Sequence, residues 1–147
     1  MKYTVYLSGE IHSNWREEIV QLCQNKNLTI EFLSPITDHE KSDSVGEVIL
    51  GKEEDSFWYD NKSSKINAIR TKTMIEKSDV VIVRFGEKYK QWNAAFDAGY
   101  ANAKGKPVIT LHSKSLIHPL KEVNSNAYAS AETTEQVCEI LAYILSD

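Results

Sequence analysis

One acidic residue, Asp97, lies in a stretch that otherwise has the pattern of a buried strand, a polar loop, a helix and a second buried strand, residues 78–109. Phe96 and Ala98 flank it, and Gly99 follows. Aspartate is a poor helix former, and an interior glycine costs about 1 kcal/mol relative to alanine, so both residues suggest close packing or the approach of a ligand. A carboxylate in this place can act as a nucleophile. By spacing alone, however, a solvated acid on the helix surface is the commoner arrangement.

Two further residues belong with Asp97 if it is reactive. Asn93 shares its helix face at i, i+4 spacing and is a candidate contact to a substrate. Tyr6 ends the first predicted strand, and its hydroxyl would orient a nearby carboxylate by a hydrogen bond. The alternative for Tyr6 is a ring packed beneath a helix with its hydroxyl at the edge.

The loop after the first predicted strand has the composition of an anion site. A Ser-Gly turn before a capped helix presents backbone N–H groups and the positive end of the helix dipole. Arg16, in the first helical turn, would add a fork for phosphate; an ordinary turn with Arg16 in solvent fits equally well. The loop holds one glycine where a dinucleotide fingerprint needs three. The candidate ligand contacts in this loop are Ser8, Gly9, Glu10 and His12.

Three more candidates come from other segments. Arg84 ends the most apolar predicted strand, and Gly86 lies in the loop that follows it. Trp58 belongs to an aromatic triplet that would stack on a flat base, or would pack the segment onto the core or onto another subunit. Glu10 and Glu87 are candidate general acids by loop position only.

Composition excludes several classes of function. The net charge is −4 with both signs mixed along the chain, which argues against a nucleic acid polymer as partner. No apolar run approaches the roughly 20 residues that span a bilayer, and no secretory signal is present, so we expect a cytoplasmic protein with no membrane partner. The only cysteines, Cys23 and Cys138, fit buried small side chains in a reducing compartment. The histidines show no metal-ligand spacing, and we expect neither a metal nor a cofactor.

The order of elements must bring these residues together. Strands are predicted over 2–8, 28–33, 79–84, 107–111 and 126–129. Helices are predicted over 13–25, 63–77, 91–104 and from 133 onward, with short helices over 45–50 and 116–122. Alternation of this kind predicts one α/β domain, residues 1–147, with a doubly wound, flavodoxin-like (Rossmann-like) parallel sheet in three αβα layers. Ligands bind such sheets at the carboxyl ends of the strands. The polar connection 36–61 is long enough to be a lid or to carry its own helices.

Two blocks of the sequence resemble a known family. VYLSGEI at 5–11 and SDVVIV with AAFDAGYANAKGKPVI, between 78 and 109, are similar to the nucleoside 2-deoxyribosyltransferase superfamily, and in particular to its YtoQ-like branch. The matching blocks cover about a third of the chain. The resemblance implies a flavodoxin-like sheet and an enzyme that cleaves or exchanges the N-glycosidic bond of deoxynucleosides or their monophosphates.

The resemblance also implies roles for particular residues. Asp97 matches the family's nucleophilic glutamate, and Tyr6 matches the tyrosine that orients it. The turn Ser8-Gly9-Glu10 would face the sugar or its phosphate. Asp97 is one methylene shorter than glutamate, about 1.5 Å. The region Arg70-Thr71 stands where the family has an aspartate near the base.

We therefore expect an enzyme acting on a small nucleoside or nucleotide, assembled as a homo-oligomer. Asp97 would be the nucleophile, Tyr6 its orienter, Arg16 or Arg84 the anion contact, and Trp58 a stacking residue. The alternatives are a non-catalytic nucleotide-binding or regulatory protein on the same scaffold, and a partner-binding domain that uses the aromatic segment.

Overall fold

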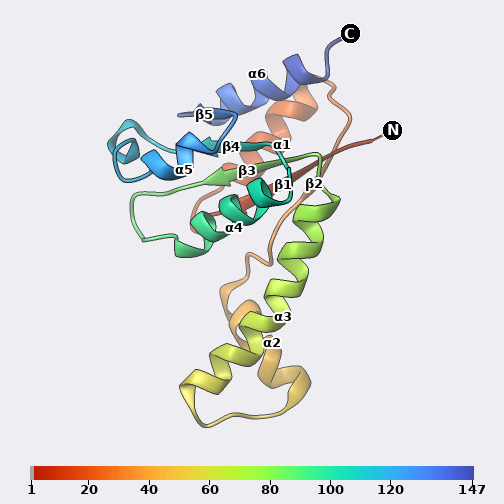
Figure 1. Ribbon diagram of the computed structural model, residues 1–147. Coiled ribbons are helices and arrows are strands. Elements are labelled where there is room, and N and C mark those ends of the chain that lie inside the picture. The colour runs from red at the N-terminus through yellow and green to blue at the C-terminus, as the bar shows by residue number, and fades with distance from the viewer. Residues whose placement is uncertain (1) are drawn as a thin grey trace.

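The computed structural model describes residues 2–147 and contains a five-stranded, all-parallel sheet of order β2-β1-β3-β4-β5 (Figure 1). This order places β1 and β3 side by side, with Tyr6 opposite Val81 in the register. It is the flavodoxin-like order, in which the direction of winding reverses between the first and third strands. The strands are β1 (Tyr3–Gly9), β2 (Ile30–Leu33), β3 (Val80–Arg84), β4 (Val108–Leu111) and β5 (Ala129–Ala131).

Helices cover both faces of the sheet and make three layers (Figure 1). One core joins α1 and α6 to residues of β1, β3 and β4 such as Leu7 and Ile82. The other joins α4, α5 and the end of α3 to the opposite face, with Tyr6 and Val81 at its centre. The helices are α1 (Trp15–Asn25), α2 (His39–Leu50), α3 (Ser56–Lys77), α4 (Trp92–Ala103), a 3-10 turn (Lys114–Leu116), α5 (Lys121–Ser125) and α6 (Thr134–Ile144).

Period-two alternation explains which strand residues face the candidate site. Leu7 faces α1, whereas its neighbours Tyr6 and Ser8 face the layer of α4, since successive side chains of a strand point to opposite faces. The central strand β3 is buried along Val80–Val83, as a parallel strand covered on both faces must be. The predicted doubly wound parallel sheet is therefore confirmed.

The long polar connection is a helical hairpin, not an open lid. The short helix predicted over 45–50 is the end of α2, which begins at His39 behind an Asp38 N-cap and ends before Gly51 at φ 99°. Helix α3 begins seven residues earlier than the predicted Ser63, with Asp55 as its cap. The hairpin projects away from the sheet (Figure 1). Helix α2 and the first turns of α3 have little apolar periodicity because they pack on each other and not on a core of the sheet, which is why only part of the hairpin was predicted.

The C-terminal third departs slightly from the prediction. The strand predicted over 126–129 lies too early in the chain. Helix α5 extends to Ser125, and the strand forms only at Ala129–Ala131. Cys23 and Cys138 are buried as expected, between α1 and α6, with their Sγ atoms 3.7 Å apart and no disulfide. No helix within residues 2–147 is long and apolar enough to cross a membrane.

Candidate functional site

Asp97 lies on α4 where that helix crosses the carboxyl end of β1. Its carboxyl group is half-buried, and burial raises its pKa from the usual 3.8 to about 6. A hydrogen bond from Ser8 acts in the opposite direction and lowers the pKa, but less than burial raises it. A carboxylate that titrates near neutrality and is partly withdrawn from water is typical of functional positions.

Ser8 is the residue that holds this carboxylate. Its Oγ donates to Asp97 Oδ2 at 2.6 Å, from a side chain with no exposed surface. This length is typical of a hydrogen bond from a hydroxyl to an ionised acceptor. Among residues 2–147, side-chain hydrogen bonding reaches only Oδ2 of the carboxylate. Oδ1 is thus left for another contact.

Tyr6 lies next to Asp97 without bonding to it. Its hydroxyl is buried and is the only buried side-chain polar atom within residues 2–147 that lacks a hydrogen-bond partner. The Thr71 side chain lies close to the hydroxyl, but the geometry falls short of a hydrogen bond. Burial, then the charge of Asp97, raises the Tyr6 pKa to about 12, so the group remains a proton donor at physiological pH. An unpartnered buried hydroxyl is costly and is usually explained by function or by a bound molecule.

A cavity of about 550 Å³ opens over Asp97. Its volume suits a small-molecule ligand. Sheet-side walls come from Gly9, Asn93 and Asp97, and the outer wall comes from the α2–α3 hairpin. Polar hairpin residues gather there and include Ser42, Asp43, Asp60, Ser63, Ser64, Asn67, Arg70, Thr71 and Lys72.

Gly9 allows the chain to turn at the floor of this cavity. Its φ is 110°, and a Cβ there would lie 2.1 Å from the carbonyl oxygen of Arg84. Only glycine fits such a backbone position. The predicted importance of this turn therefore has a steric basis.

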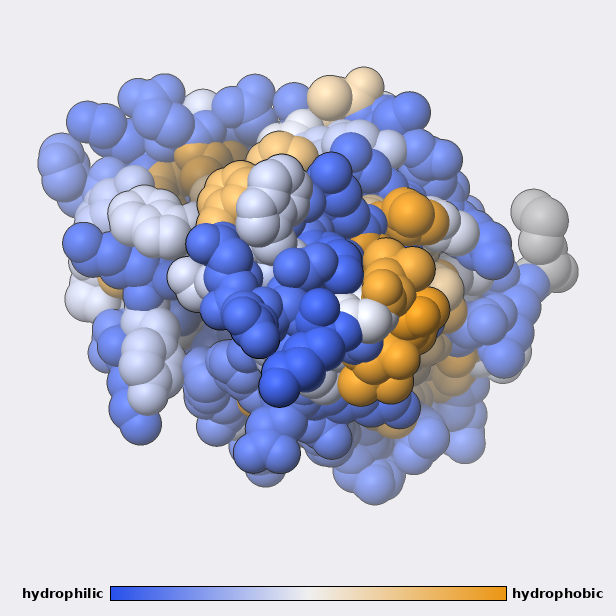
Figure 2. Space-filling view, turned by 90° about the horizontal axis from the view of Figure 1, so that it is seen from below, coloured by the Kyte–Doolittle hydropathy of each residue, from blue (hydrophilic) through white to orange (hydrophobic). Residues whose placement is uncertain are grey.

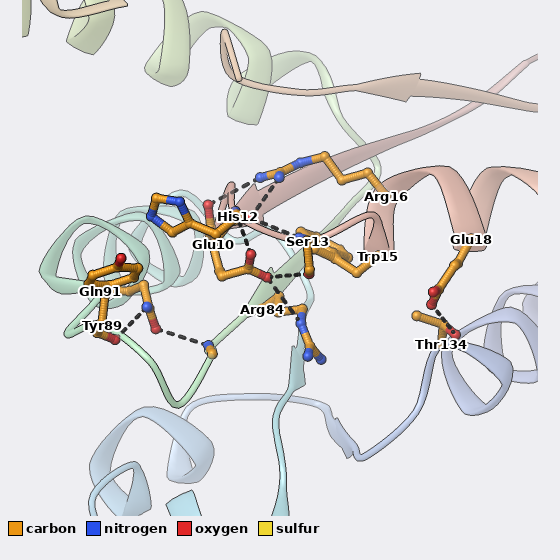
Figure 3. Close-up of polar contacts among 12 residues, drawn as sticks. Glu10, His12, Ser13, Trp15, Arg16, Glu18, Arg84, Tyr89, Gln91 and Thr134 are labelled. Carbon is orange, nitrogen blue, oxygen red and sulfur yellow. Dashed lines mark hydrogen bonds and ion pairs between the residues drawn. The ribbon is translucent and has the colours of Figure 1, made fainter. Parts of the chain in front are cut away.

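Several candidates gather in a separate cluster that does not line the cavity (Figure 3). Glu10 accepts hydrogen bonds from the backbone N–H of His12 at 2.5 Å and from Ser13 Oγ at 2.8 Å, and it pairs with Arg84 Nε at 3.4 Å. Burial raises its pKa, but the hydrogen bonds and Arg84 outweigh that effect and hold the pKa below its usual value. Gly86 packs closely against Glu10: a Cβ added at Gly86 would lie 2.9 Å from Glu10 Cγ.

Arg16 points into the protein and binds backbone carbonyl oxygens (Figure 3). Its guanidinium donates to the carbonyl oxygens of Leu7 at 3.0 Å, Gly9 at 3.2 Å and Glu10 at 2.7 Å. Burial lowers its pKa, and the side chain is almost fully enclosed. Neither Arg16 nor Arg84, the two predicted anion contacts, lines the cavity. Both instead bind the segment that ends β1, Arg16 through backbone carbonyl oxygens and Arg84 through the Glu10 carboxylate.

The remaining candidates also lie away from the cavity. The ring of His12 packs against Tyr89 with centroids 4.5 Å apart. Trp58 is exposed in the first turn of α3 and does not line the cavity. Glu87 accepts hydrogen bonds from Ser113 and Ser115 outside the cavity.

Sequence reasoning missed the cations that do line the cavity, Arg70 and Lys72 on α3. Both are exposed, and Arg70 makes only a 3.4 Å contact to the Ser34 carbonyl oxygen. A weak signal existed, since Asn67, Arg70 and Thr71 recur at i+3 and i+4 on one helix face. No group of three or more metal-ligating side chains occurs within residues 2–147.

Comparison with known proteins assigns a family. The family model described as "Nucleoside 2-deoxyribosyltransferase YtoQ" matches residues 6–145. A Bacillus subtilis (strain 168) protein named "Uncharacterized protein YtoQ" is 49% identical over 144 residues, which cover 98% of this chain and 97% of that protein. The match extends far beyond the two blocks that carried the resemblance.

Solved structures share the fold at low sequence identity. A conserved protein of Enterococcus faecalis V583 superposes with a TM-score of 0.69 at 16% identity, covering 99% of this chain and 100% of that one. A 2-deoxyribosyltransferase of Bacillus psychrosaccharolyticus gives 0.55 at 16% identity, with 91% and 89% covered. A CMP N-glycosidase of Clostridium botulinum gives 0.54 at 14% identity, with 97% and 99% covered.

Proposed function

The chain belongs to the YtoQ family of nucleoside 2-deoxyribosyltransferases, and from that premise we propose that it acts on the N-glycosidic bond of a nucleoside or nucleotide, with Asp97 as nucleophile. The observation that carries the proposal is the Asp97 carboxylate, half-buried at the floor of a cavity of about 550 Å³ and held by Ser8. Burial removes water from the carboxylate, and Ser8 keeps it ionised and fixed in direction.

The chemistry divides into two displacements. First an Asp97 oxygen attacks the anomeric carbon, the bond from that carbon to the base nitrogen breaks, and its electron pair leaves with the base, which takes up a proton. Then water, or a second base, attacks the same carbon and loses a proton. The ester bond to Asp97 breaks and the carboxylate is restored. Two inversions give net retention of configuration.

Tyr6 and Ser8 share the positioning role in this proposal. Ser8 binds Oδ2 in the free protein, so it holds the carboxylate before substrate arrives. The unpartnered Tyr6 hydroxyl is available to donate once substrate is bound. Because its pKa lies near 12, Tyr6 keeps its proton throughout the working pH range.

The anion contact is reassigned to α3. Arg70 and Lys72 are the basic residues that line the cavity, which they share with serines, Asn67 and the acidic residues Asp43 and Asp60. A guanidinium with hydroxyl and amide neighbours suits a phosphate. We infer that a nucleoside 5′-monophosphate binds more tightly than the nucleoside.

The test is base release from a panel of deoxynucleosides, ribonucleosides and their 5′-monophosphates, followed by chromatography. Wild-type protein should release a base, and Asp97→Asn and Asp97→Ala should not, with unchanged circular dichroism. Release by the variants at the wild-type rate would refute the mechanism. A saturable thermal shift with a nucleotide and no release from any compound would instead identify a binding or regulatory protein.

A further inference from the structure

The Tyr6 hydroxyl has no direct contact with the cavity. The Tyr6 side chain has no exposed surface and does not line the cavity, whereas its neighbours Thr71 and Asp97 both line it. A ligand in the cavity can therefore act on the Tyr6 hydroxyl only through a residue that touches both. Thr71 on α3 and Asp97 on α4 have that position, so Tyr6 lies behind two residues that a ligand can contact.

Thr71 has an uncommitted hydroxyl. Within residues 2–147 it makes no hydrogen bond, although Thr73, two residues further along α3, donates to the Ile69 carbonyl oxygen at 2.8 Å. Back-bonding of this kind to the preceding helical turn is a common arrangement for threonine. The Thr71 proton is therefore available to another acceptor, and the Tyr6 oxygen lies close to it.

The wall that carries Thr71 is polar. Seen from the end of the hairpin, the molecule is largely hydrophilic around one hydrophobic patch (Figure 2). The cavity face of α3 has the same polar character, with Asn67 and Arg70 beside Thr71. Hydrogen bonds and charge, and not apolar contact alone, therefore hold a ligand against this wall, and Thr71 is one of the groups that it meets.

The chemistry of a phenol hydroxyl gives Thr71 a role. Such a hydroxyl donates one proton and accepts at its oxygen. A hydrogen bond from Thr71 to the Tyr6 oxygen leaves the Tyr6 proton for an acceptor on the other side. Oδ1 of Asp97 is that acceptor, because Ser8 already occupies Oδ2 at 2.6 Å. In such a chain each hydrogen bond polarises and strengthens the next.

We propose that Thr71 is a positioning residue that acts on Asp97 through Tyr6, in a chain that closes when a ligand fills the cavity. The proposal rests on the proposed function, since it concerns how the nucleophile is held during the reaction. In the ligand-free protein the Asp97 carboxylate is partly exposed and the Tyr6 hydroxyl is unpartnered. A ligand expels water from the carboxylate, and the Tyr6 proton takes its place at Oδ1. A second lone pair of Oδ1 remains for the anomeric carbon.

Thr71→Val tests the proposal, because it removes the hydroxyl and keeps the size of the side chain. The kcat of base release should fall about 2- to 10-fold, as expected for the loss of one hydrogen bond, with little change in KM. Thr71→Ser, which keeps the hydroxyl, should restore most of the rate. Thr73→Val is the matched control, because Thr73 is an exposed threonine of the same helix that does not line the cavity, and its kcat should equal that of the wild type.

A double-mutant cycle shows whether Thr71 acts through Tyr6. In a Tyr6→Phe background the hydroxyl that Thr71 orients is gone, so adding Thr71→Val should leave kcat unchanged. Were Thr71 to bind the substrate directly, or only to shape the wall, the two losses would multiply, as they do for independent residues. Losses that multiply would overturn the proposal, and so would a Thr71→Val variant with the kcat of the wild type.

A measurement without substrate tests the premise that the chain is open in the ligand-free protein. Because the Tyr6 hydroxyl is buried without a partner, Tyr6→Phe should melt at the wild-type temperature or above it. A lower melting temperature would show that the hydroxyl already has a partner, and would overturn closure by a ligand. Base release with multiplying losses removes this proposal alone, whereas no base release from any compound removes the proposed function and this proposal with it.

Discussion

Replacing Ser8 with alanine should raise the pKa of Asp97. The Ser8 hydroxyl donates to Asp97 Oδ2 at 2.6 Å and favours the ionised carboxylate, so its loss favours the protonated form. A hydrogen bond to a charged group is worth about 1.5–3 kcal/mol, and the half-buried position of Asp97 argues for the lower end. Since about 1.4 kcal/mol corresponds to one pKa unit, the expected rise is about one unit.

The consequence is a displaced pH profile. With the Asp97 pKa near 6 in the wild type, activity that needs the carboxylate should rise through about pH 6. In Ser8→Ala the rise should come about one unit higher, which lowers kcat/KM roughly tenfold at pH 5 through protonation alone. At pH 9 both carboxylates are ionised, so any remaining loss measures positioning. Tyr6, with a pKa near 12, does not titrate in this range.

The assay is the pH dependence of base release, paired with a carbon-13 NMR titration of the aspartate carboxyl groups. The NMR titration needs no substrate and so stands even without turnover. Ser64→Ala is the matched control, because Ser64 lines the cavity but donates to the Asn61 carbonyl oxygen and should leave the midpoint unchanged. An Asp97 midpoint in Ser8→Ala equal to or below the wild-type value would refute the reasoning.

Three further substitutions test the carboxylate, the cavity wall and the hairpin. Because the pKa of Asp97 in the folded protein lies above its usual 3.8, ionised Asp97 destabilises the fold; this cost is absent below about pH 4 and complete above about pH 6. The free energy of unfolding of Asp97→Asn should therefore exceed that of the wild type by about 2 kcal/mol at pH 8 and equal it at pH 3.5, as denaturant unfolding would show. Arg70→Gln should raise KM for a 5′-monophosphate about 10-fold or more and leave the nucleoside nearly unaffected, whereas the exposed Lys65→Gln on the same helix should change neither. Gly46→Ala should lower the melting temperature, since the added Cβ would lie 2.5 Å from Lys62 Cβ, and a stability equal to wild type would mean that the hairpin packs differently.

The fold was largely predictable because its signals are local. The apolar run ending at Arg84 predicts a strand covered on both faces, and the alternation of strands and helices predicts the parallel sheet. Asp97 was placed correctly at the carboxyl edge because that edge is common to all strands of such a sheet. The hairpin was predicted only in part, because α2 packs on α3 alone and so lacks an apolar stripe.

The contacts of the site were less predictable because they depend on tertiary neighbours. Ser8 and Asp97 lie 89 residues apart in the sequence, and no local pattern pairs them. Arg16 was predicted either to bind an anion or to lie in solvent, yet it is buried and donates to three carbonyl oxygens. A buried arginine and a ligand-binding arginine have the same local sequence signature. Arg70 reaches the cavity only because α3 runs along its outer wall.

The central claim is that Asp97 forms a covalent bond to the sugar. The most direct measurement is mass spectrometry of protein quenched in acid during turnover of the compound that releases base, followed by peptide mapping. The account predicts a mass increase of one glycosyl group on the peptide that contains Asp97, and none in Asp97→Asn. Base release without an adduct on that peptide, or with the adduct on another residue, would contradict it.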